Sequence, residues 1–237
     1  MNSQITIFEN QDIIYEMSAV SGEAWKNMAA AKPVSKSEFL DMLEPADILV
    51  TRSDATKIPN TNTVEKAGGI IVGKVLTTAM GVPFTSTKIA LDKKRVLGFG
   101  ASGFGSGSVD IADINKFLSW QKNVMICRYP KLTNAQQSGI IKYLLSKRNL
   151  NFDTNKLITT WWERLVHGEQ MLKSRMKMNM SKQEIKGWKD ALFCSSLVAM
   201  AYKSVGINAD FTREPTEMWP KDFVASEDLD QLVMLYL

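Results

Sequence analysis

Two short β segments joined by a polar turn constrain the fold of this chain most. Thr85 to Leu91 and Arg95 to Phe99 are rich in apolar and β-branched residues, and only the turn Asp92 to Lys94 separates them. Asp47 to Thr51 and Val124 to Tyr129 have the composition of further strands. Helical patterns lie before, between and after these segments, and neither an internal repeat nor a clear linker divides them. The sequence therefore predicts a single α+β domain.

Capping motifs and apolar spacing indicate where the helices begin and end. Ser35 and Thr133 each open a capping box, with Glu or Gln three positions later, so we predict helices from these residues to about positions 43 and 147. An apolar helix is predicted over 193–205, and a basic, mostly helical segment over 155–189. The tail beyond residue 206 contains two prolines and an acidic stretch and is expected to be irregular.

Length and composition are those of one enlarged globular domain. The chain has 237 residues, of which 45% are apolar and 23% charged, so it can bury a core. We predict an N-terminal helical extension over residues 1–44 and the main domain over 45–237, with a basic helical insertion at about 155–189. No strongly apolar stretch free of charge reaches 18 residues, and the N-terminus lacks the basic and apolar regions of a signal peptide. The sequence thus predicts no membrane span and a cytoplasmic location.

Scarcity of cysteine and histidine excludes several kinds of site. The chain contains two cysteines, Cys127 and Cys194, and one histidine, His167, and none of these forms a pair at metal-ligand spacing. We therefore predict no metal and no cofactor. His167 lies near the end of a predicted helix, where a histidine more often serves as a terminal cation than as a base.

A glycine-rich segment follows the second predicted strand. Gly98, Gly100 and Gly103 have the spacing of a dinucleotide-binding fingerprint, but that motif requires a helix to start within it. Gly105 and Gly107 continue the segment, and glycines disfavour a helix. A connecting loop is the favoured interpretation.

The basic segment offers one surface for a polyanion. Its cations outnumber its acidic residues, so it could follow a phosphate backbone, although a solvated helical face is the more common outcome of such a pattern. The residues concerned are Lys173, Arg175, Lys177, Lys182, Lys186 and Lys189.

Cys194 is the candidate nucleophile. It lies near the start of the predicted apolar helix, where unpaired amides and the positive end of the helix dipole favour thiolate over thiol. A buried structural cysteine is the alternative interpretation. Cys127 lies within a predicted strand and is expected in the core.

The order of several segments resembles the circularly permuted NlpC/P60-like, papain-like cysteine hydrolases, a group described by its YaeF/YiiX-like members. The nucleophile segment of that family reads Tyr/Phe-Cys-Ser-Glu-Leu-Val, and Phe193 to Val198 is similar to it. The resemblance implies a papain-like fold with a small antiparallel sheet or partial barrel packed on helices. The other matching segments, in the family's order, are Ala46 to Arg52, Gly81 to Leu91, Val109 to Trp120, Cys127 with Arg128, and Trp219 to Phe223.

The chain departs from the family at the catalytic base. Alignment on the resemblance puts Lys88 where the family has its histidine, and a slip of one residue would put Thr87 there. The next strand, Val96 to Gly100, offers no carboxylate to orient a base, and Ser196 replaces the usual glutamate after the cysteine. Imidazole serves as base because its pKa lies near 7, whereas lysine starts at about 10.4. Lys88 could still act as a fixed cation beside the thiol.

The resemblance implies two functional hypotheses. In the first, catalysis is lost and the fold serves as a binding or assembly module for protein partners, with a virion or tail component of a bacterial virus as one such role. In that case the location would be the virion. In the second, the chain is an active amidase, peptidase or acyl-transfer enzyme with Cys194 and Lys88 as catalytic residues. Its substrates would be cell-wall peptides, as in peptidoglycan, or acyl lipids.

Overall fold

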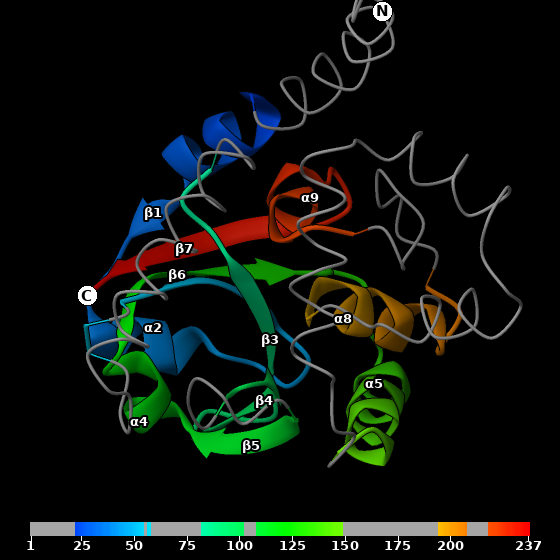
Figure 1. The fold of residues 1–237 in the computed structure, drawn as a ribbon. Coiled ribbons are helices and arrows are strands. Elements are labelled where there is room, and N and C mark those ends of the chain that lie inside the picture. Colours follow the sequence, from blue (N-terminus) through cyan, green and yellow to red (C-terminus); the bar gives the residue numbers. More distant parts are fainter. Residues whose placement is uncertain (1–21, 55, 58–81, 102–107, 149–193, 208–217) are drawn as a thin grey trace, which may run out of the picture.

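The structure is a computed structural model that describes residues 22–54, 56–57, 82–101, 108–148, 194–207 and 218–237 (Figure 1). Residues 22–30 are helical. The further elements, in chain order, are β1 (Lys32–Pro33), α2 (Lys36–Met42), β2 (Ile48–Ser53), β3 (Ser86–Ala90), β4 (Arg95–Phe99), β5 (Val109–Asp113), α4 (Ile114–Leu118), β6 (Gln121–Arg128), α5 (Asn134–Ser146), α8 (Cys194–Lys203), α9 (Pro220–Ala225) and β7 (Asp230–Tyr236).

One open sheet organises these elements. Its strand order is β1-β7-β6-β2-β3-β4-β5. Every neighbouring pair is antiparallel except β1 with β7, which run parallel. The predicted α+β class is therefore confirmed, with a mostly antiparallel sheet. None of the helices in the described part of the chain has the length and apolarity that a membrane crossing requires.

Strand alternation gives the sheet two buried faces. Ile48, Val50 and Ile89 belong to one core, which α5, α8 and α9 complete with side chains such as Leu144, Leu197 and Phe223. Leu49 and Ala90 belong to the other core, which α2 and α4 cover with Phe39 and Phe117. Figure 1 shows α5 and α8 on one side of β3, and α2 and α4 on the other.

Both predicted capping boxes are present. The Ser35 side chain accepts a hydrogen bond from the Glu38 amide, and the Glu38 carboxylate accepts one from the Ser35 amide at 2.9 Å. Thr133 and Gln136 make the same reciprocal pair at the start of α5. Each box satisfies amides that a helix start leaves unpaired, which explains why α2 and α5 begin where the sequence predicts.

The prediction of an irregular tail is wrong. Residues 220–225 form α9, and residues 230–236 form β7, which lies between β1 and β6 in the sheet. Pro220 is the first residue of α9, a position where a missing amide hydrogen costs the helix nothing.

The segment before residue 45, predicted as an extension, contributes β1 to the sheet and the buried Phe39 to a core. The predicted insertion over 155–189 lies outside the described residues.

Candidate functional site

Cys194 is the first residue of α8, a helix that packs beside β3 (Figure 1). Two hydrogen bonds to backbone carbonyls hold α8 in place. Ser195 Oγ donates to Met218 O, and at the other end of the helix the buried Tyr202 hydroxyl donates to Ala46 O at 2.7 Å. Cys194 itself is partly exposed. The helix is therefore fixed near both ends while its thiol stays accessible, an arrangement that suits a nucleophile.

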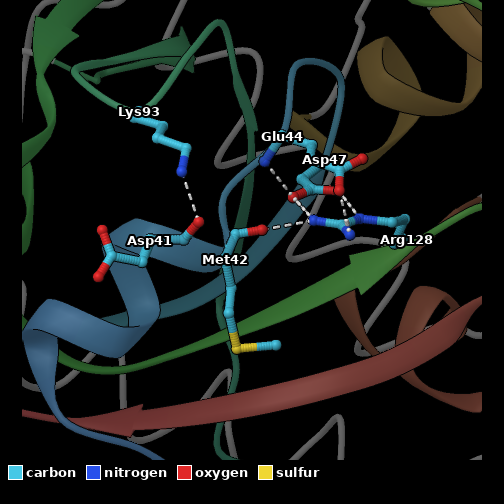
Figure 2. Close-up of polar contacts among 6 residues, drawn as sticks. All are labelled: Asp41, Met42, Glu44, Asp47, Lys93 and Arg128. Atoms are coloured by element: carbon cyan, nitrogen blue, oxygen red, sulfur yellow. Dashed lines mark hydrogen bonds and ion pairs between the residues drawn. The ribbon is translucent and has the colours of Figure 1, made fainter.

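The turn that receives Tyr202 is fixed by a buried ion pair (Figure 2). Arg128, at the end of β6, donates from Nε to Asp47 Oδ1 at 2.7 Å and from Nη2 to Asp47 Oδ2 at 2.8 Å. The same guanidinium reaches Glu44 Oε1 at 2.7 Å and Met42 O at 2.6 Å. This cluster joins β6, the turn before β2 and the end of α2, and so determines where Ala46 can accept the bond from α8.

The environment of the ion pair shifts the pKa values of both partners. Burial raises the pKa of Asp47, and the hydrogen bonds from Arg128 and the Glu44 amide oppose that rise. The hydrogen bond to Asp47 raises the pKa of Arg128. Ala46, between Glu44 and Asp47, has a φ of 71°, a left-handed conformation that favours glycine. This turn is therefore built at some conformational cost.

Lys88 lies on β3 and is buried, with only 4% of its surface exposed. Its Nζ donates to Ser86 Oγ at 2.5 Å and to Thr87 O at 3.4 Å. Burial lowers the pKa of Lys88, while electrostatic interactions with Cys194 and Asp110 oppose that fall. The structure thus brings Lys88 within electrostatic range of Cys194, although 106 positions separate the two in sequence.

Asp110 is a residue of this site that sequence reasoning missed. The next strand after Lys88, β4, indeed lacks a carboxylate, but β5 carries Asp110 directly opposite Gly98 of β4. A Cβ atom on residue 98 would lie 2.6 Å from Lys88 Cδ, so the lysine side chain lies close against this glycine. A carboxylate two strands away from its target leaves no local signal in the sequence. Only the prediction of a strand from Val109 onward could have indicated that Asp110 lies in the same sheet as Lys88.

Strand alternation distinguishes the two candidates for the base position. Val50 pairs with Thr87, and Ile89 follows two residues later, so Thr87 belongs to the row of β3 that faces the α8 side. Lys88 belongs to the row of Ala90, in the other core. Thr87 is fully buried, and its hydroxyl oxygen has no hydrogen-bond partner among the residues that the structure describes. Of the two residues that the alignment allows at the base position, the one in the α8-facing row is therefore Thr87, whose side chain does not titrate near neutral pH.

The remaining predicted residues do not join this site in the described structure. Cys127 lies on β6 and is fully buried, and burial raises the pKa of its thiol. His167 and the six basic residues from Lys173 to Lys189 lie outside the described residues. Within the described ranges, no cluster of three or more His, Cys, Asp or Glu side chains could hold a metal ion.

Comparison with known proteins adds no family assignment to this geometry. The chain matches no model of a known protein family and no curated protein sequence.

Proposed function

We propose that this chain is a binding or assembly module built on a papain-like cysteine-hydrolase fold, with hydrolytic turnover weak or absent. One observation carries the proposal: of the two residues that the alignment allows at the base position, Thr87 is the one in the α8-facing row of β3, and its hydroxyl cannot take a proton from the thiol or from water. The nearby amine of Lys88 already donates to Ser86 Oγ and Thr87 O. Loss of a general base typically lowers the rate by about 10²–10⁴-fold.

The arrangement of α8 supports a retained binding surface. Its position depends on bonds from Ser195 and Tyr202 to backbone carbonyls, which do not require a catalytic base. A partly exposed thiol at the start of a fixed helix can still contact a peptide or an acyl group. Cell-wall peptides, acyl lipids and protein partners in an assembly such as a viral tail are the ligand classes that the family resemblance implies.

A second candidate function, acyl transfer by Cys194 with Lys88, is favoured by one specific observation. Burial lowers the pKa of Lys88, which is the direction that a lysine needs to act as a base near neutral pH. In that case the amine would take the proton of the Cys194 thiol, and the thiolate would attack an amide or ester carbonyl. As the thioester forms and the C–N or C–O bond breaks, the ammonium group would return the proton to the leaving amine or alcohol. The hydrogen bond to Ser86 and the charge of Asp110 work against this role, because both stabilise the ammonium form.

Turnover on peptidoglycan fragments and acyl esters tests the proposal. Wild type is compared with Cys194→Ala, Thr87→His and Lys88→His, with Lys142→His on the exposed surface of α5 as the matched control. We expect wild-type turnover to equal that of Cys194→Ala, and thiol-dependent turnover to appear in a variant with histidine on β3. Wild-type turnover that Cys194→Ala abolishes would overturn the binding-module proposal and favour the acyl-transfer enzyme.

A further inference from the structure

Lys88, Gly98 and Asp110 lie in one row across three neighbouring strands. The β3–β4 ladder pairs Ala90 with Val96 and Ile89 with Leu97, and one further step along both strands brings Lys88 opposite Gly98. On the other side of β4, Gly98 pairs with Asp110. The sheet therefore places a cation and a carboxylate on either side of a residue that has no side chain.

The lysine side chain occupies the space at Gly98. A Cβ atom on residue 98 would lie 2.6 Å from Lys88 Cδ, 3.4 Å from Lys88 Cα and 3.5 Å from Thr87 O. Real Cβ atoms essentially never approach another heavy atom to 2.6 Å, so any side chain at position 98 would displace Lys88. The absence of a side chain at this position is thus what allows Lys88 to lie against β4 while 4% exposed.

A buried ammonium group requires a countercharge. The hydrogen-bond acceptors of Lys88 Nζ, Ser86 Oγ and Thr87 O, are both uncharged. Transferring an unpaired cation from water into a protein interior is strongly unfavourable. The charged groups of the described chain that act on Lys88 are Cys194 from α8 and Asp110 from β5, and Asp110 is the carboxylate of the two.

We propose that Gly98 and Asp110 are the positioning residues for Lys88: Gly98 leaves the space for its side chain, and Asp110 supplies the countercharge that keeps it buried against β4. This inference deepens the proposed function, on which it rests in taking Lys88 as a group of the Cys194 site. It also explains how a lysine stands where the resemblance expects an imidazole. The carboxylate comes from β5, across the glycine of β4, and not from the strand next to Lys88.

The titration of Lys88 itself tests the inference, independently of any turnover. The protein is labelled with ¹³C at lysine Cε, the Lys88 signal is assigned by its loss in Lys88→Met, and its shift is followed against pH. We expect Asp110→Asn to lower the titration midpoint by about 1 pH unit or more, because removing an opposite charge disfavours the ammonium form. Asp110→Glu should keep the midpoint near that of wild type. Asp41→Asn, an exposed carboxylate of α2, should leave it unchanged.

Gly98→Ala provides an independent arm of the experiment. The added methyl group should displace the side chain, so the Lys88 signal should move toward those of exposed lysines and its midpoint should rise. If Asp110→Asn does not fold, Asp110→Ser removes the same charge. An unchanged midpoint in a folded neutral variant would overturn the role of Asp110, and an unchanged Lys88 signal in Gly98→Ala would overturn the role of Gly98. Neither result depends on whether the chain hydrolyses a substrate, so failure of the proposed function would be seen separately.

Discussion

Replacing Arg128 with methionine tests how strongly the ion pair with Asp47 stabilises the fold. Asp47 is 1% exposed and accepts both of its Arg128 hydrogen bonds at 2.7 and 2.8 Å, so the variant leaves a buried carboxylate without its cation. Breaking a buried pair from one side costs about 3–5 kcal/mol. The Arg128 side chain is 20% exposed, and water can therefore partly replace it. We expect the free energy of unfolding to fall by about 3 kcal/mol at pH 7.

The loss should depend on pH in a defined direction. Burial raises the pKa of Asp47 above its unfolded value, and removing Arg128 takes away the main group that opposes this rise. Between the unfolded and folded pKa values the native state binds more protons than the unfolded state, so stability falls as the pH rises through this window. The stability of Arg128→Met relative to wild type should therefore improve as the pH is lowered from 7 toward the unfolded pKa of about 4.

Urea unfolding at several pH values measures the free energy of unfolding of four proteins: wild type, Arg128→Met, Arg95→Met and the double variant Asp47→Asn/Arg128→Met. Arg95→Met is the matched control, because its ion pair with Asp92 is largely exposed and should contribute less than about 1 kcal/mol. The double variant Asp47→Asn/Arg128→Met should recover more than half of the loss, since it removes the unpaired carboxylate. A loss below about 1 kcal/mol at pH 7, or no recovery in the double variant, would refute the reasoning.

Two further predictions concern the helix that carries the thiol and its neighbour. In the folded protein iodoacetamide should alkylate the partly exposed Cys194 and spare Cys127, which is fully buried and whose thiol pKa is raised by burial. Mass analysis of peptides measures the alkylation rate at each cysteine, and equal rates at the two cysteines would contradict the prediction. Gly139→Ala should weaken the packing of α5 against the turn that follows α8, although alanine favours helices by about 1 kcal/mol, because its Cβ would lie 2.5 Å from Val205 Cγ1. Thermal unfolding should show this loss, and its reversal in Gly139→Ala/Val205→Ala, whereas a higher midpoint for Gly139→Ala alone would contradict the close packing.

Local signals predicted much of the fold, because their physical causes act over a few residues. The capping boxes at Ser35 and Thr133 determine where α2 and α5 begin, and the turn after Leu91 joins β3 to β4 as expected. The prediction of an irregular tail was wrong for a different reason. The strand β7 contains the run Leu232 to Tyr236, which has no alternation, and its place between β1 and β6 depends on partners distant in sequence.

The candidate site was likewise predictable from the sequence only in part. The position of Cys194 at a helix start followed from local pattern, and its neighbourhood with Lys88 was expected from the resemblance alone. Asp110 could not be found, because the row that joins it to Lys88 crosses three strands whose register is a tertiary property. The orientation of Thr87 against Lys88 was equally undetermined, since the alignment allowed a slip of one residue.

Which of the two residues, Thr87 or Lys88, occupies the base position decides between the two proposed functions. A strand presents alternate residues to opposite faces, so a histidine at position 87 would enter the row on the α8 side, and one at position 88 would enter the other row. If Thr87→His gains thiol-dependent turnover and Lys88→His does not, the fold retains a hydrolase cleft that lacks only its base, and the lysine is a separate structural cation. If only Lys88→His gains turnover, Lys88 itself occupies the base position. The hydrogen bond to Ser86 would then be what keeps the native amine from serving there.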